Sequence, residues 1–485
     1  MKQLPDLWFD ATKCFINGEW VAPIGGEQLA LTDPSTGVEI GSIARGKSAD
    51  IDAAVAAAED ARHGEWGRMP AFEKGRILNR LGRLILTKTE ELARLEAIDV
   101  GKPLTQARND VIAMARYMEF YAGAADKVHG ETIPYLDGYT VYTMREPHGV
   151  TGHIVPWNYP MQIIGRSVGG ALTMGNTCVL KPAEEACLTA LAFADLARQA
   201  GLPKGVLNVV PGLGAEAGKS LSNHRGIHHM SFTGSVGTGQ SIQSAAAQNV
   251  IPVTLELGGN AACIVDADQK SRLDKVIERL VFGAFYQSGQ SCIGVQRILI
   301  HKDIYDELKQ RLITATNALV AGDPRKEDTF IGPMISTGEA ERLDTWIQEA
   351  VRAGGKLLCG GKRDGAMLDA TLLEGVPLDQ DVCVEEAFGP VAVLSSFTDF
   401  EAALAQVDDS KFGLQAGIFT NDLDKAMHAW DRLDVGGVVI GDVPSWRVDN
   451  MPYGGVKDSG LGREGVKFAM EDMTEIRNLV IRARP

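Results

Sequence analysis

Three residues of the 485-residue sequence occupy settings suited to catalysis: Cys292, Glu256 and Asn158. Cys292 lies in SGQSCIG, where glycine, serine and glutamine indicate a polar, accessible thiol, although a single cysteine is more often buried and inert. Glu256 lies at the end of an apolar run in LELGGN, where desolvation raises the pKa of a carboxyl group toward the range of a general base. Asn158 lies between the prolines of VPWNYP, which aim an amide that can donate to an oxyanion. The structural alternatives are a buried hydrogen-bond acceptor for Glu256 and a turn residue for Asn158.

Two glycine-rich turns are candidates for binding phosphate. One turn, with Gly234, Gly237 and Gly239, follows IHHMSFT and precedes a helical run, and a second, with Gly214, spans residues 212–218. Backbone N–H groups at such a helix start favour a phosphate. Neither turn has the Gly-x-Gly-x-x-Gly spacing, so dinucleotide binding and ordinary turn glycines both remain open.

Lys181 and Glu184, in KPAE, follow another expected strand. A glutamate there can accept hydrogen bonds from both hydroxyls of an adenosine ribose and repel a 2′-phosphate, which would select NAD over NADP. The alternative is a solvated lysine and a glutamate favoured by a helix N-terminus.

The elements that must position these residues alternate between strand and helix. Between 149 and 260, short β-branched runs alternate with helical stretches, which predicts a parallel sheet with helices on both faces. Ligands on such a sheet bind at the carboxyl ends of the strands. Residues 262–430 repeat the alternation, so we expect a second α/β layer. Segments 127–147 and 475–484 are expected to form a small β-platform whose edges are available to another subunit.

The composition excludes several classes of protein. A net charge of −15 without a basic cluster argues against nucleic acid as a partner, and no apolar window is long enough for a membrane span. The seven cysteines include no Cys-x-x-Cys pair, which indicates free thiols and a soluble cytoplasmic protein. Apart from His224 and His228, which lie four residues apart, no histidine has helical spacing to a cysteine or another histidine, so we expect no metal site.

Seven motifs occur in an order that resembles the aldehyde dehydrogenase superfamily over essentially the whole chain. They are PWNYP (156–160), GNTCVLKPAE (175–184), FTGSVGTG (232–239), LELGGN (255–260), GQSC (289–292), EEAFGPV (385–391) and PYGGVKDSGLGREG (452–465). The resemblance implies an α/β fold that forms homodimers or homotetramers. Its three parts would be a Rossmann-type NAD-binding domain (1–124 and 148–256), an α/β catalytic domain (257–455) and a small β oligomerisation flap (125–147 and 473–485).

The resemblance also implies an activity, the oxidation of an aldehyde to a carboxylic acid with NAD. Cys292 would attack as a thiolate, Asn158 and the backbone N–H of Cys292 would hold the oxyanion, and Glu256 would activate the water that hydrolyses the thioester. Glu386 would hold the nicotinamide ribose, with Phe388 beside the nicotinamide. The full set of residues expected to bind the cofactor is Ile154, Pro156, Trp157, Lys181, Glu184, Gly214, Phe232, Gly234, Ser235, Glu386 and Phe388.

Three residues bear on the substrate. Arg166 is similar in position to the arginine with which succinic semialdehyde dehydrogenases bind a distal carboxylate. Tyr286 stands where those enzymes commonly carry a second arginine, and its ring can pack an aromatic aldehyde. Arg447, in SWRVDNMPYGG, can supply a second positive charge. We therefore expect an aldehyde with a carboxylate or other acidic group, aliphatic or aromatic, with a structural salt bridge as the alternative role of Arg166.

Other functions remain open. A CoA-acylating member of the superfamily typically lacks the general-base glutamate, whereas Glu256 is present here. A thiol esterase or hydrolase would use Cys292 but would not need Lys181 or Glu184. A non-catalytic protein on this fold is disfavoured because Cys292, Glu256 and Asn158 occur together.

Overall fold

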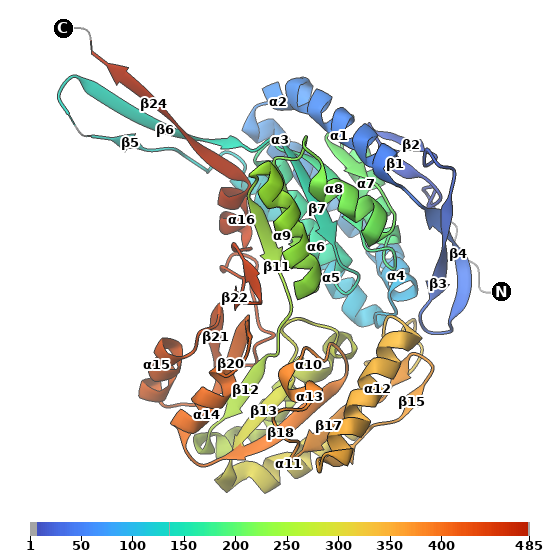
Figure 1. The fold of residues 1–485 in the computed structure, drawn as a ribbon, viewed down its shortest axis with the longest axis vertical. Helices are drawn as coiled ribbons and strands as arrows, with labels where there is room; N and C mark the ends of the chain where they lie inside the picture. The colour runs from blue at the N-terminus through green and yellow to red at the C-terminus, as the bar shows by residue number, and fades with distance from the viewer. Residues whose placement is uncertain (1–6, 135, 484–485) are drawn as a thin grey trace.

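Two α/β units make up most of the molecule, and a three-stranded sheet projects from the side of the first (Figure 1). The computed structural model describes residues 7–134 and 136–483. Residues 1–6, 135 and 484–485, which fall in the ranges predicted for the NAD-binding domain and the flap, lie outside the described residues. The arrangement confirms the predicted α/β class.

The first sheet contains eight strands: β1 (Cys14–Ile16), β2 (Glu19–Val21), β7 (Val150–Val155), β8 (Thr177–Pro182), β9 (Leu207–Val209), β10 (His229–Thr233), β11 (Val253–Glu256) and β23 (Gly460–Leu461). Their order is β2-β1-β9-β8-β7-β10-β11-β23. The run from β9 to β11 is parallel, and β1 and β23 border it in antiparallel orientation. The parallel run therefore brings the carboxyl ends of five predicted strands to one edge of the sheet.

Helices cover both faces of this sheet, so strand β8 is buried on both sides. Cys178 and Leu180 pack into the core on one face, whereas Val179 packs into the core on the other, because side chains alternate along a strand. The helices of this unit are α1 (Ser48–His63), α2 (Glu65–Arg68), α3 (Ala71–Thr87), α4 (Thr89–Asp99), α5 (Leu104–Ala124), α6 (Pro160–Thr173), α7 (Leu188–Gln199), α8 (Lys219–Asn223), α9 (Val236–Asn249) and α16 (Val466–Asp472).

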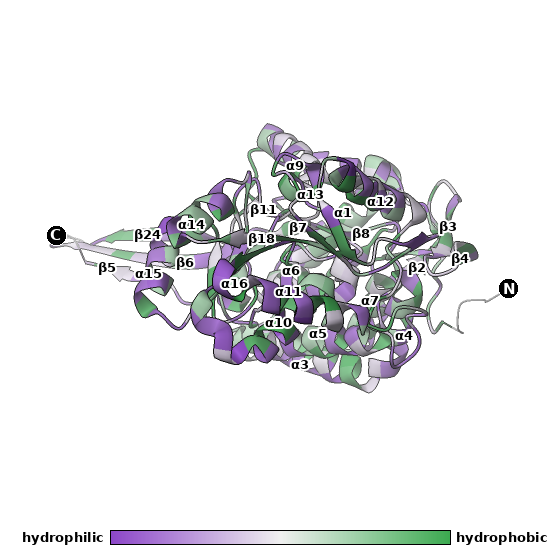
Figure 2. Ribbon diagram, turned by 90° about the horizontal axis from the view of Figure 1, so that it is seen from below, coloured by the Kyte–Doolittle hydropathy of each residue, from purple (hydrophilic) through white to green (hydrophobic). Residues whose placement is uncertain are grey.

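The second sheet contains seven strands: β12 (Ala262–Val265), β13 (Arg297–His301), β14 (Lys356–Cys359), β17 (Thr371–Glu374), β18 (Val391–Phe397), β20 (Gln415–Phe419) and β21 (Gly437–Ile440). Its order is β14-β17-β18-β13-β12-β20-β21, parallel except at β14. Its helices are α10 (Leu273–Phe285), α11 (Lys302–Asn317), α12 (Thr337–Arg352), α13 (Asp381–Val384), α14 (Phe400–Asp408) and α15 (Leu423–Arg432). Figure 2 shows hydrophobic residues along the central strands and hydrophilic residues on the outer turns of the helices.

The projecting sheet contains β5 (Thr132–Ile133), β6 (Tyr139–Pro147) and β24 (Thr474–Arg482), in the order β24-β6-β5. β24 pairs with β6 along its whole length in antiparallel register, from Thr474 opposite Pro147 to Arg482 opposite Tyr139. The two segments predicted to form a β-platform therefore do lie together. The exact domain boundaries proposed from the sequence remain predictions.

Short paired strands account for the remaining sheets: β3 (Gln28–Asp33) with β4 (Val38–Ala44), β15 (Arg363–Asp364) with β16 (Met367–Leu368), and β19 (Phe412–Gly413) with β22 (Val456–Lys457). Across residues 7–134 and 136–483, no helix combines the length and apolar character needed to cross a membrane.

Candidate active site

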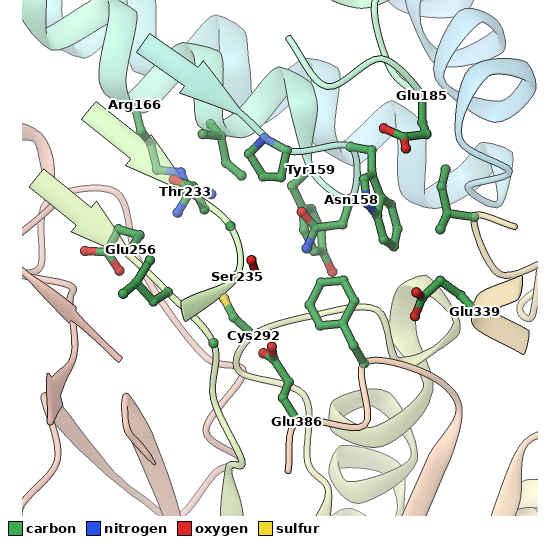
Figure 3. Close-up of a pocket in the computed structure, with 18 of the residues that line it drawn as sticks. Asn158, Tyr159, Arg166, Glu185, Thr233, Ser235, Glu256, Cys292, Glu339 and Glu386 are labelled. Carbon is green, nitrogen blue, oxygen red and sulfur yellow. The ribbon is translucent and has the colours of Figure 1, made fainter. Parts of the chain in front are cut away.

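A cavity of about 400 Å³ lies where the two units meet, and the three predicted catalytic residues line it. Asn158 follows β7, Glu256 ends β11, and Cys292 lies in the loop before β13. Figure 3 shows the Cys292 side chain between Glu256 and Asn158. Of the other predicted residues, those that line the same cavity are Pro156, Trp157, Arg166, Gly234, Ser235, Glu386 and Phe388.

The backbone before Cys292 is held in an unusual conformation. Gln287 and Ser288 have φ values of 55° and 53°, in the left-handed region that non-glycine residues seldom adopt. Gly289, at φ 69°, follows them, and a Cβ there would stand 2.1 Å from the carbonyl oxygen of Gly389. Such strain persists only where surrounding contacts hold it, so the loop before Cys292 is held in one conformation.

Cys292 is partly exposed, and its Sγ lies 3.2 Å from the hydroxyl oxygen of Tyr453. Burial raises the pKa of the Cys292 thiol to about 12, and the Tyr453 hydrogen bond opposes that rise. The thiolate that chemistry requires is thus costly to form without hydrogen-bond donors around it.

The side-chain amide of Asn158 donates one of its two hydrogens to the loop before Cys292. Its Nδ2 donates to the carbonyl oxygen of Gln290 at 2.9 Å, and the side chain of Gln287 donates to the Asn158 carbonyl oxygen at 3.1 Å. Because a primary amide has two N–H donors, one remains to meet an oxyanion in the cavity.

Glu256 is a buried carboxyl group at 4% exposure, and neither of its oxygens has a hydrogen-bond partner in the described part of the chain. Burial is the main cause that raises the pKa of Glu256 well above its usual value, and the charge of Glu464 adds to the rise. A desolvated carboxyl group beside a reactive thiol has the properties of a general base.

Glu386 is placed differently, because its carboxylate has one fixed partner. The backbone N–H of Gly259 donates to Oε1 at 2.8 Å, and burial raises the pKa of Glu386 to about 7. A Cβ at Gly258 would stand 2.6 Å from Oε2, so only glycine allows the carboxylate to lie there. Trp157 and Phe388 meet edge to face nearby, with ring centroids 5.5 Å apart.

The remaining cofactor candidates gather at the carboxyl edge of the first sheet. Ile154 on β7 lies in register with Lys181 on β8 and with Phe232 on β10. Glu184 accepts from Lys181 Nζ at 2.7 Å and from the backbone N–H of Gly214 at 3.3 Å.

The start of α9 lies at the same edge. Ser235 caps the helix, with its Oγ accepting from the backbone N–H of Thr238 at 3.4 Å. A capped helix N-terminus beside a paired lysine and glutamate fits a ribose followed by a pyrophosphate.

The three substrate candidates occupy different surroundings. Arg166 lines the cavity, donates through Nη1 to Glu464 at 2.9 Å and through Nε to the carbonyl oxygen of Gln162 at 3.3 Å. Arg447 stands 3.5 Å from the same Glu464 oxygen, with its guanidinium 4.0 Å from the centre of the Tyr453 ring.

Tyr286 does not belong to the walls described for this cavity. Its ring packs against Phe282, with ring centroids 4.7 Å apart, and its hydroxyl lies 3.5 Å from Asn109 Nδ2. Tyr286 is the first residue of the 3₁₀ segment η3 (Tyr286–Gly289), which directly follows α10.

Tyr453 and Glu464 are among the cavity residues that received no role from the sequence. Both lie within PYGGVKDSGLGREG, so the motif marked the segment but not which side chains reach the cavity. Nothing in the spacing indicates that Tyr453 meets Cys292, since the two lie 161 positions apart.

The chain is similar to known proteins over nearly its whole length. The Aldehyde dehydrogenase family matches residues 20–479. A 3-sulfolactaldehyde dehydrogenase of Priestia aryabhattai is 39% identical over 472 residues, covering 96% of this chain and 97% of that protein.

Two solved structures show the same fold. A putative aldehyde dehydrogenase from Burkholderia cenocepacia has a TM-score of 0.94 at 47% identity, covering 97% of this chain and all of the other. An NAD⁺ complex of an aldehyde dehydrogenase from Bacillus cereus has a TM-score of 0.95 at 36% identity, covering 98% and 97%. The chain belongs to the aldehyde dehydrogenase family, and it is an enzyme that oxidises aldehydes.

Proposed function

We propose that this enzyme oxidises an aldehyde to a carboxylic acid through a thioester on Cys292, with NAD as the oxidant. The observation that supports this most is the convergence of Cys292, Asn158 and the unpartnered carboxyl group of Glu256 on one cavity. A nucleophile, an oxyanion donor and a base are the three groups that such a reaction needs.

The chain's residues supply the acyl-transfer steps. The Cys292 thiolate adds to the aldehyde carbon, and the free N–H of Asn158 with the backbone N–H of Cys292 stabilises the oxyanion. After oxidation to the thioester, Glu256 removes a proton from water, whose oxygen attacks the acyl carbon. The carbon–sulfur bond then breaks, and the carboxylic acid leaves.

NAD fits the groups at the edge of the first sheet. Lys181 and Glu184 would hold the adenosine ribose, the start of α9 the pyrophosphate, and Glu386 the second ribose. Bound there, NAD supplies the oxidising power by accepting the hydride. Glu184 favours NAD because its carboxylate repels a 2′-phosphate.

An acidic group on the substrate is supported by the charges around Glu464. Two guanidinium groups, Arg166 and Arg447, face the one carboxylate of Glu464. Arg166 Nη2 makes no hydrogen bond to any described residue, so it remains able to donate to a substrate anion. The Priestia relative is named for a sulfonated aldehyde, which is consistent with an anionic tail.

A homo-oligomer and a cytoplasmic location are also proposed. The projecting sheet exposes apolar side chains, among them Met144 at 63% and Leu479 at 58%, which a second copy can cover. All seven cysteines are unpaired, which supports a reducing compartment.

The test is NADH formation from an aldehyde by wild type and by Cys292→Ala, together with NAD binding to both. We expect turnover in the wild type only and NAD binding in both proteins. Product analysis with and without CoA separates the hydrolytic reaction from a CoA-acylating one, because only the latter would need CoA for turnover. Ester hydrolysis by wild type without any NADH formation from aldehydes would favour the esterase instead.

A further inference from the structure

The phenol of Tyr453 is the side chain that hydrogen bonds to the Cys292 sulfur. The hydroxyl oxygen lies 3.2 Å from Sγ, within the distance of a sulfur hydrogen bond. Tyr453 is 4% exposed and packs with Ile293 and Leu414, which fix the ring beside the thiol. The loop that carries it is tied to Glu464 by reciprocal backbone hydrogen bonds, at 3.0 Å from Tyr453 N and 2.6 Å from Glu464 N.

Either atom of this pair can be the donor, and the surroundings decide which. Burial raises the pKa of Tyr453 well above its usual value, so the phenol keeps its proton throughout the neutral range. The Arg447 guanidinium lies over the ring, 4.0 Å from its centre, and a cation at that place favours electron withdrawal from the hydroxyl. A phenol that stays protonated beside a cation is a good donor toward an anionic sulfur.

We infer that Tyr453 is a further catalytic residue, whose hydroxyl donates a hydrogen bond to the Cys292 thiolate and thereby increases the fraction of enzyme that carries the nucleophile. This inference rests on the proposed role of Cys292. It assigns a function to a residue that carries none in the acyl-transfer steps described above.

The energetic balance favours the reaction. A hydrogen bond that lowers the pKa of the thiol also makes the thiolate a weaker nucleophile. As the pKa falls, however, the logarithm of the nucleophilicity decreases only about half as steeply as the logarithm of the thiolate fraction increases. Below the pKa of the thiol, the gain in thiolate therefore exceeds the loss in reactivity. The donor helps most where burial alone would keep Cys292 protonated.

The experiment is the pH dependence of alkylation of Cys292 by iodoacetamide, in wild type and Tyr453→Phe, followed by mass spectrometry of the Cys292 peptide. Cys359, the other partly exposed thiol, serves as an internal reference in each sample. Tyr305→Phe is the matched control, because it removes a hydroxyl that bonds to Glu374, far from Cys292. Thermal unfolding of each variant establishes that the protein is folded.

We expect the alkylation profile of Cys292 to move to higher pH in Tyr453→Phe, with a rate at neutral pH reduced about 3- to 10-fold. The Tyr305→Phe profile and the Cys359 reference should not move. A profile for Tyr453→Phe that stays in place, or moves to lower pH because the thiol had been the donor, would overturn the inference.

A second variant keeps the test decisive if Tyr453→Phe unfolds. Incorporation of 3-fluorotyrosine at position 453 preserves the shape but makes the hydroxyl a stronger donor, so the profile should move to lower pH. No movement, or movement to higher pH, contradicts the inference.

Alkylation does not depend on turnover, so failure of the two proposals can be told apart. If Cys292→Ala still oxidises aldehydes, the proposed function fails whatever the alkylation profiles show. If Cys292→Ala is inactive while Tyr453→Phe alkylates like wild type, only the role of Tyr453 fails.

Discussion

Arg166 and Glu464 lie 298 positions apart in the sequence, yet the Arg166 guanidinium donates to the Glu464 carboxylate at 2.9 Å, and both residues line the cavity of Cys292. The pair is almost fully buried, with side chains 10% and 8% exposed. This ion pair therefore places one positive and one negative charge in the cavity wall. The Arg447 guanidinium lies beside the same carboxylate as a second cation.

The first prediction concerns substrate charge. Arg166→Met should lower kcat/KM for succinic semialdehyde and carboxybenzaldehyde about 10-fold more than for benzaldehyde, because only the charged aldehydes lose an ion pair. Steady-state kinetics on the three aldehydes provides the measurement. Equal losses on charged and neutral substrates would leave Arg166 with the structural salt bridge alone.

The second prediction concerns cofactor choice. Glu184→Ser should raise kcat/KM for NADP and lower it for NAD, because the carboxylate that repels a 2′-phosphate is gone and Lys181 is left unpaired. Glu216→Gln is the control, since Glu216 pairs with Arg45 in the neighbouring turn. An unchanged ratio of the two kcat/KM values in Glu184→Ser would refute the assignment of the ribose site.

The third prediction concerns pH. Because the pKa of Glu256 is raised by burial and by Glu464, the base is protonated at low pH, and kcat limited by thioester hydrolysis should rise with pH as that proton is lost. Glu464→Gln removes the like charge and should move the rise to lower pH. Arg166→Met removes a charge that lowers the same pKa and should move it to higher pH. Movement of both profiles in one direction would contradict this assignment.

The fourth prediction concerns assembly. Leu479→Asp combined with Val480→Asp places charge on both faces of β24, and the particle mass measured by light scattering should fall toward the 52.1 kDa of one chain. Leu423→Asp, at a leucine on α15 that is 72% exposed, should leave the mass unchanged. A full-size oligomer in the double variant would show that the projecting sheet does not hold the subunits together.

The sequence predicted the fold well wherever a local pattern determines structure. The alternation of the short β-branched runs of β7, β8 and β10 with helical stretches predicted a parallel sheet, and these strands are largely buried on both faces. Such patterns do not extend to the N-terminal hairpins. β1 and β2 have three residues each, too few for any period to be read.

The sequence predicted a role for a cavity residue only where that residue stands in a distinctive short motif. Cys292, Glu256 and Asn158 stand in distinctive local sequences, and their expected convergence agrees with the cavity. Tyr453 and Glu464 reach the same cavity through tertiary packing of the C-terminal segment, which no spacing reveals. Tyr286 packs against Phe282, a contact that no local motif predicts.

The most direct test of the mechanism is a single-turnover experiment on Glu256→Gln with NAD and an aldehyde substrate. The account predicts a burst of one equivalent of NADH without further turnover, and an acyl group on the Cys292 peptide by mass spectrometry. Steady turnover at the wild-type rate, or an acyl group on another cysteine such as Cys359, would contradict it.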